Sequence, residues 1–179
     1  MEKKINDITI EAMKGNIVDQ KDISTVVNAA NAQLRMGGGV AGAIHRKAGS
    51  ELEKETRDLA PISPGEAVIT GAHKLPNKYI IHVLGPVYGR DKPEPEILAS
   101  CYRNALNIAE KHNLKSIAFP AISTGAFGYP IEDAAEVAFN TILAMTEEIE
   151  NVKLIRFVLY SDRDYEVHKI AMEKIMETT

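Results

Sequence analysis

The stretch SIAFPAISTGAFG, at residues 116–128, runs from a short segment that is mostly apolar directly into a glycine-containing loop. A brief apolar run such as residues 116–119 is typical of a buried strand. Residues 123–128 form the loop, and its glycines lack the Cβ atom that keeps a backbone away from a ligand. Such a loop can direct several N–H groups at one anionic oxygen. The stretch therefore predicts a buried strand that ends at an anion-binding loop.

A second glycine loop, GGGVAG at residues 37–42, leads into a helical pattern over residues 40–49. A helix N-terminus at this point would add free N–H groups and the positive end of a dipole. If the two loops meet in space, they enclose a diphosphate from both sides. We therefore expect a pocket for a nucleotide diphosphate.

Strand and helix patterns alternate through the second half of the chain, which predicts an α/β sandwich with a mainly parallel or mixed sheet. Ligands in such sheets bind beyond the carboxyl ends of the strands. Asn28, Ser123 and Ser161 come just after predicted strands, so we expect the candidate loops to gather at one edge of the sheet. The predicted strands are residues 8–13, 25–27, 67–70, 79–84, 116–119 and 154–160, and the predicted helices are residues 40–49, 50–59, 94–112, 130–145 and 164–176.

Composition and charge narrow the class of protein. With 179 residues, 45% of them hydrophobic, and no low-complexity tract, we expect a single domain over residues 1–179. The net charge of −4 argues against broad nucleic-acid binding. No segment approaches the roughly 20 apolar residues of a membrane span, and residues 1–4 do not begin a signal peptide. We therefore expect a cytoplasmic protein without a membrane partner.

Cysteine and histidine residues give no sign of a metal or redox site. The one cysteine, Cys101, falls in an amphipathic helical pattern and is predicted to be a reduced thiol in the core. The five histidines are scattered, and none has metal-site spacing. His82 lies in an apolar strand, where we expect a hydrogen-bonded core residue, and His45 is expected on a solvated helix face. No metal and no cofactor is predicted.

Two further features each have two interpretations. Asn28 and Asn31 could present amide groups to the vicinal hydroxyls of a ribose, or they could cap local turns. Tyr160, at the end of a predicted strand, could stack on a base or cap the core.

Two enzyme motifs match only in part. The glycines of residues 37–42 have the spacing of the dinucleotide fingerprint, but residues 28–36 separate them from the preceding strand, whereas the fingerprint begins directly after one. Ser123, Asp162 and His168 follow the chain order of a hydrolase triad. Asp162 and His168, however, fall at or inside one predicted helix, and such a triad takes these partners from separate loops. The sequence disfavours both motifs.

Taken together, the chain from Ile8 to Met176 resembles a macro domain, the ADP-ribose-binding module. The resemblance implies a three-layer α/β/α sandwich with a mixed central sheet. Each matching piece is weak alone, but all of them occur in the family's order. The pieces are GNI at residues 15–17, NAAN at 28–31, GGGVAGAIHRKAG at 37–49, IHVLGP at 81–86 and AFPAISTGAFGYP at 118–130.

The resemblance also implies a ligand site at both glycine loops. Asn31 would contact the distal ribose, Phe127 would pack against that sugar, and Tyr160 would stack on adenine. Asn31 and the backbone of Gly39 would hold the water of a hydrolytic reaction. The implied ligand-binding residues are Asn16, Ile17, Asn31, Gly37, Gly38, Gly39, Val40, Ala41, Ser123, Thr124, Gly125, Ala126, Phe127 and Tyr160.

The chain departs from the family pattern at two positions. Asn16 stands where the family usually has an aspartate that accepts a hydrogen bond from the adenine amino group, so we expect looser binding or relaxed base selectivity. Ala41 stands where many hydrolytic members carry an aspartate that helps to position or activate water. We therefore expect a slow hydrolase that depends on positioning, with the substrate's own phosphate as the base.

These features predict a protein that binds ADP-ribose and hydrolyses ADP-ribosyl esters, either O-acyl-ADP-ribose or mono-ADP-ribosylated acidic side chains of proteins. Ala41 favours the alternative, a module that recognises ADP-ribose without turnover. A third class, a nicotinamide-dependent oxidoreductase, would bind NAD tightly. A macro domain pocket should prefer ADP-ribose, because the nicotinamide would crowd the distal-ribose end.

Overall fold

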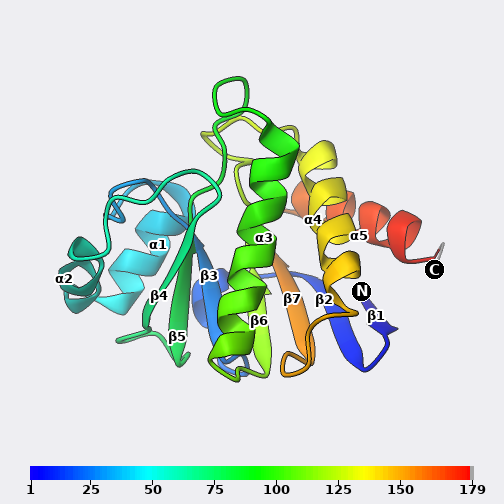
Figure 1. Ribbon diagram of the computed structural model, residues 1–179, viewed down its shortest axis with the longest axis horizontal. Helices are drawn as coiled ribbons and strands as arrows, with labels where there is room; N and C mark the ends of the chain where they lie inside the picture. Colours follow the sequence, from blue (N-terminus) through cyan, green and yellow to red (C-terminus); the bar gives the residue numbers. More distant parts are fainter. Residues whose placement is uncertain (178–179) are drawn as a thin grey trace.

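A seven-stranded mixed sheet lies between two layers of helices in the computed structural model, which describes residues 1–177 (Figure 1). This is the three-layer α/β/α sandwich predicted from the sequence. The strands are β1 (Glu2–Ile5), β2 (Ile8–Lys14), β3 (Thr25–Ala29), β4 (Ala67–Gly71), β5 (Tyr79–Val83), β6 (Ser116–Phe119) and β7 (Leu154–Leu159). The helices are η1 (Ile17–Asp19), α1 (Gly39–Ala48), α2 (Glu51–Arg57), α3 (Glu94–Lys111), α4 (Ile131–Met145) and α5 (Asp162–Met176).

The strand order is β1-β2-β7-β6-β3-β5-β4, and the five central strands run parallel to one another. The two edge strands, β1 and β4, pair antiparallel with their neighbours. Because the central strands share one direction, their carboxyl ends lie at the same edge of the sheet. Residues that follow β3, β5, β6 and β7 are therefore brought together there.

Successive residues of the central strands pack into two different cores. Val27 and Phe157 belong to the larger core, beneath α3, α4 and α5, whereas Val26 and Val158 belong to the second core, beneath η1, α1 and α2. This alternation follows from the side-chain period of a strand. Strands buried on both faces read as continuous apolar runs, which is why these segments were recognisable from the sequence.

Two short elements were not predicted, β1 and η1. β1 pairs with β2 through residues 2–5 and has a half-exposed pattern with charged side chains, which carries little strand signal. The turn between the two strands contains Asn6 at φ 56°, a left-handed conformation that asparagine tolerates. η1 begins at Asn16, whose side-chain Oδ1 accepts a hydrogen bond from the Val18 N–H at 3.2 Å.

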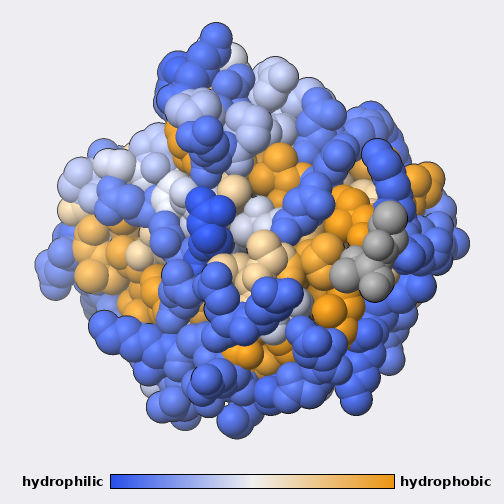
Figure 2. Space-filling view, turned by 45° about the vertical axis from the view of Figure 1, so that its right-hand side comes forward, coloured by the Kyte–Doolittle hydropathy of each residue, from blue (hydrophilic) through white to orange (hydrophobic). Residues whose placement is uncertain are grey.

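The face toward the C-terminal end of the chain is mostly hydrophilic, with separate hydrophobic patches (Figure 2). On α5, Ile170 is 61% exposed and lines a shallow groove of about 260 Å³ against α4. None of the helices within residues 1–177 has the length and hydrophobicity that a membrane crossing requires.

Candidate functional site

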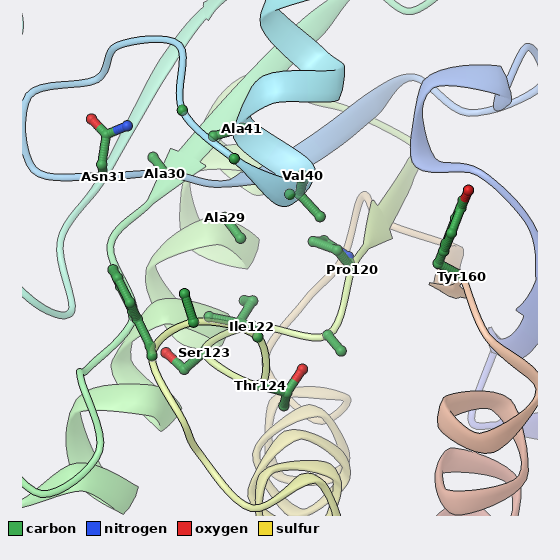
Figure 3. Close-up of a pocket in the computed structure, with 18 of the residues that line it drawn as sticks. Ala29, Ala30, Asn31, Val40, Ala41, Pro120, Ile122, Ser123, Thr124 and Tyr160 are labelled. Atoms are coloured by element: carbon green, nitrogen blue, oxygen red, sulfur yellow. The ribbon is translucent and has the colours of Figure 1, made fainter.

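A pocket of about 400 Å³ opens at the carboxyl edge of the central strands (Figure 3). Both glycine loops line it, as expected for loops that gather at one edge of the sheet. Of Asn28, Ser123 and Ser161, which were expected at this edge, Ser123 lines the pocket, and residues that follow β3, β5 and β7 line it as well. The predicted site residues that line it are Asn31, Gly37, Gly38, Gly39, Val40, Ala41, Ser123, Thr124, Gly125, Ala126, Phe127 and Tyr160.

The first loop delivers the N-terminus of α1 to the pocket. Gly38 is the N-cap, and the earliest hydrogen bond of the helix runs from the Gly42 N–H to the Gly38 carbonyl at 3.2 Å. A Cβ atom at Gly42 would collide with the carbonyl oxygen of Gly37, so the loop can fold back over its helix only with glycine there. Within residues 1–177, the N–H groups of residues 37–41 donate no hydrogen bond.

The second loop is held by its carbonyl groups. The Ser123 carbonyl accepts from the Tyr129 N–H at 2.9 Å, and the Phe127 carbonyl accepts from the Tyr88 N–H at 2.8 Å. Ser123 itself adopts a left-handed φ of 66°. In the described part of the chain, the N–H groups of residues 123–127 have no acceptor. Each loop therefore presents a run of unpaired amide donors, which is the arrangement of a backbone anion site.

The electrostatics of the pocket come from dipoles and not from basic side chains. Of the residues described, no Lys, Arg or His lines the pocket, and the one charged residue in its wall is Asp164. The positive end of the α1 dipole at Gly39 adds to the amide donors. An anion in this pocket would thus be stabilised by neutral N–H groups alone.

The two asparagines have different roles. Asn28 lies inside β3 and is fully buried, and its Nδ2 donates to His82 Nδ1 at 3.0 Å, so the idea that it faces a ribose was wrong. Asn31 does line the pocket. Its side chain also caps a local turn, because Nδ2 donates to the Arg35 carbonyl at 2.8 Å and Oδ1 accepts from the Arg35 N–H at 3.0 Å. One hydrogen on Nδ2 and one lone pair on Oδ1 remain for a ligand.

Tyr160 stands across the pocket from Asn31 (Figure 3). Its side chain is not a core cap, because the residue is 80% exposed. An aromatic ring held at the mouth of a pocket offers a face for stacking, an interaction of about 1–3 kcal/mol for a base. Because the side chain is exposed, the interpretation of Tyr160 as a cap on the core is excluded, and stacking on a base remains.

Asn16 and Ile17 do not line this pocket. They belong to the start of η1, which packs on the second core beside Val158, a residue of the pocket wall. The buried Gln20 fixes their backbone, because its Nε2 donates to the Asn16 carbonyl at 2.9 Å and its Oε1 accepts from Arg156 at 2.9 Å. Arg156 in turn binds the Asp22 carboxylate at 2.7 Å.

The hydrolase triad does not exist in the structure. Asp162 pairs with Lys14 at 2.7 Å, while His168 is buried and donates from Nδ1 to the Asp164 carbonyl at 2.8 Å. Both lie on α5, and His168 packs against core aromatic rings. Ser123 has neither of them as a partner.

The buried histidines have lowered pKa values. Burial lowers the pKa of His82 to about 3, with a smaller contribution from His45. Burial also lowers the pKa of His45, which was expected on a solvated face and is instead 2% exposed. His82 and Cys101 are buried as predicted, and burial raises the pKa of the Cys101 thiol to about 12. Within residues 1–177, no three His, Cys, Asp or Glu side chains gather as a metal site.

Several wall residues were not predicted as ligand-binding residues. Most of them lie in the last residues of a central strand or just after one, so the rule that ligands bind beyond strand ends could have found them. Asp164 is different, because it lies in the first turn of α5 and its side of the helix depends on packing. These wall residues are Ala29, Ala30, Gly85, Pro120, Ala121, Ile122, Val158, Leu159 and Asp164.

Comparison with known proteins gives one family. The sequence model of the macro domain matches residues 27–138. A macro domain-containing protein of Caldanaerobacter subterraneus subsp. tengcongensis is 46% identical over 171 residues, which cover 93% of this chain and 97% of that protein.

Solved structures agree with the sequence relatives. The Oceanobacillus iheyensis macrodomain with ADP superposes with a TM-score of 0.96 at 40% identity, over 100% of this chain and 97% of that one. The Trypanosoma brucei macrodomain in complex with ADP-ribose superposes with a TM-score of 0.85 at 34% identity, over 91% of this chain and 68% of that one.

Proposed function

Because the chain belongs to the macro domain family, we propose that its pocket binds ADP-ribose and that the protein hydrolyses ADP-ribosyl esters. The substrate is O-acyl-ADP-ribose or a mono-ADP-ribosylated acidic side chain of a protein. The observation that carries the binding proposal is the pair of amide runs, residues 37–41 and 123–127, which face one pocket without acceptors in the described chain. Two such runs match the two phosphates of a diphosphate.

The ligand is oriented by what stands at the two ends of the pocket. Tyr160, exposed at one end, stacks on adenine, and the Asn16–Ile17 segment beside the second core approaches the edge of the base. Asn31, at the other end, uses its remaining hydrogen and lone pair on the distal ribose, against which Phe127 packs. Solved relatives with ADP and with ADP-ribose support this assignment of the pocket.

Hydrolysis in this pocket relies on positioning. Asn31 and the backbone N–H of Gly39 hold a water molecule beside the ester. The water oxygen bonds to the acyl carbon of the ester while one of its protons passes to a diphosphate oxygen of the substrate. The bond from the acyl carbon to the ribose oxygen then breaks, and the diphosphate oxygen returns the proton to the ribose oxygen, which leaves as a hydroxyl. Ala41 supplies no carboxylate for this proton transfer, so the reaction is slow.

The second candidate function, a module that recognises ADP-ribose without turnover, is favoured by the same Ala41. Calorimetric titration with ADP-ribose tests binding. A parallel titration with NAD tests the oxidoreductase class, which predicts tighter binding of NAD. Acetate release from O-acetyl-ADP-ribose then separates the two candidates. We expect slow acetate release that is lost in Asn31→Ala. Release no faster than the uncatalysed rate would favour the module that recognises ADP-ribose without turnover.

A further inference from the structure

Asp164 is the one charged residue among those that line the pocket. Its backbone is fully used, since its N–H donates to Ser161 Oγ at 3.1 Å and its carbonyl accepts from His168. Its carboxylate has no hydrogen bond and no ion pair to any residue in the described range 1–177. No hydrogen bond or ion pair among the described residues therefore accounts for the charge.

The neighbouring acid shows the contrast. Asp162 lies in the same first turn of α5, but its carboxylate pairs with Lys14 at 2.7 Å and does not line the pocket. Both acids face the positive end of the same helix dipole, so this stabilisation is common to them. What distinguishes Asp164 is that it lines the pocket and that its carboxylate has no hydrogen bond or ion pair among the described residues.

The position of Asp164 identifies which part of a ligand it meets. It follows Tyr160 by four residues, and the pocket wall contains both. Asn31 lies across the pocket from Tyr160 (Figure 3). If Tyr160 stacks on the base, the group within reach of Asp164 is the ribose attached to that base.

We propose that Asp164 is a specificity-determining residue, which accepts a hydrogen bond from the vicinal hydroxyls of the adenosine ribose and rejects ligands phosphorylated there. This rests on the proposed function, since it uses the same ligand orientation. A carboxylate binds a hydroxyl donor well, but it repels a phosphate at the same place because both are anionic. With no basic side chain in the described wall to offset this repulsion, selection between the two ribose forms follows from Asp164.

The test compares ADP-ribose with its 2′-phosphorylated analogue by calorimetric titration of the full chain. We expect the wild-type protein to prefer ADP-ribose by about tenfold or more, the size expected for one close pair of like charges. Asp164→Asn should reduce this preference at least fivefold, chiefly through tighter binding of the phosphorylated ligand. Asp162→Asn, the matched control in the same turn, should keep the wild-type preference.

Two outcomes would overturn the inference. One is a wild-type protein that binds both ligands equally, and the other is an Asp164→Asn variant with the wild-type preference. Thermal unfolding of each protein shows whether a change in affinity comes from lost folding. Asp164→Ser, which also removes the carboxylate, should lose the preference in the same way as Asp164→Asn. If ADP-ribose binds to the wild-type protein, the proposed binding function stands whatever the preference; if it does not bind, both proposals fail.

Discussion

Ser123 packs against Gly85 so closely that a side chain at position 85 would overlap the Ser123 hydroxyl. Gly85 follows β5, and Ser123 opens the second glycine loop, so the contact joins two strand ends that are distant in sequence. Ser123 is 7% exposed, and its backbone adopts a left-handed φ at the start of the loop. Gly85 therefore supports the conformation that points the 123–127 amides into the pocket.

The methyl group of Gly85→Ala should displace Ser123 and change the orientation of the N–H groups of residues 123–127 relative to the pocket. Overpacking of this kind costs about 1–3 kcal/mol of stability, and we expect at least a tenfold loss of ADP-ribose affinity. Urea unfolding and calorimetric titration measure the two effects. Gly71→Ala is the control, because a Cβ atom there meets only ordinary contacts at 3.7 Å or more. Wild-type affinity in Gly85→Ala would contradict the supporting role.

Binding of ADP-ribose should depend little on salt. No Lys, Arg or His among the described residues lines the pocket, so there is no ion pair for salt to screen. We expect the dissociation constant to change by less than about twofold between 50 and 500 mM NaCl, because screening acts mainly on exposed charges. Titrations across this range measure it. A tenfold weakening would reveal a basic contact that the pocket geometry does not contain.

Asn16→Asp should tighten binding of ADP-ribose. Aspartate is as good an N-cap as asparagine, so the hydrogen bond to the Val18 N–H and the start of η1 are kept. A charged acceptor for the adenine amino group makes a stronger hydrogen bond, and we expect a gain of about three- to tenfold. Comparison of ADP-ribose with its inosine analogue, which lacks that amino group, checks the cause. An equal gain for both ligands would exclude the contact with the amino group.

Ala41→Asp should accelerate acetate release from O-acetyl-ADP-ribose. The side chain at position 41 already lines the pocket, so the new carboxylate can accept a proton from the attacking water. General-base catalysis contributes about 10²–10⁴-fold at best, and we expect at least a tenfold rise in kcat. Single-turnover kinetics separate this from a change in binding. An unchanged kcat would mean that the position does not face the reacting ester.

Stability should fall as the pH is lowered from about 6.5 toward 3. Burial lowers the pKa of His82 to about 3 in the folded protein, whereas an unfolded histidine titrates near 6.5. In this window the unfolded chain binds the proton and the folded chain does not, so this group removes about 1.4 kcal/mol per pH unit. His45 and His168, whose pKa values are also lowered by burial, act in the same direction.

His82→Gln tests this pH dependence, since glutamine does not titrate and can still reach Asn28 and Thr70, the partners of His82. Urea unfolding between pH 4 and 7 should give a shallower slope than wild type. His112→Gln, at an exposed histidine, should keep the wild-type slope. A His82→Gln slope equal to wild type would show that His82 is not the titrating group.

Most of the fold could be predicted because the sheet is buried on both faces. The segments 116–119 and 131–145 were placed to within a residue, since continuous apolar runs and a proline at a helix start are local signals. β1 was missed because its residues are charged and half-exposed, and only pairing with β2 makes them a strand.

The site was predictable where backbone chemistry determines it and less so where packing does. The two glycine loops line one pocket as expected, because the glycine pattern and the strand ends can both be predicted from the sequence. Asn28 and His45 were misplaced because a polar residue looks solvated until its neighbours are known. Asn28 is buried inside the central strand β3, where His82 on the adjacent strand accepts a hydrogen bond from its amide. Asp164 was not predicted because its orientation follows from how α5 packs.

The pairing of β3 with β6 has a consequence for how the protein acquires its ligand. The loops that carry the two amide runs follow neighbouring strands, and paired strands lie about 4.8 Å apart. Both loops are therefore anchored in the same sheet. The ligand site therefore forms when the sheet folds. We expect bound ADP-ribose to protect the backbone amides of the central strands together from hydrogen exchange.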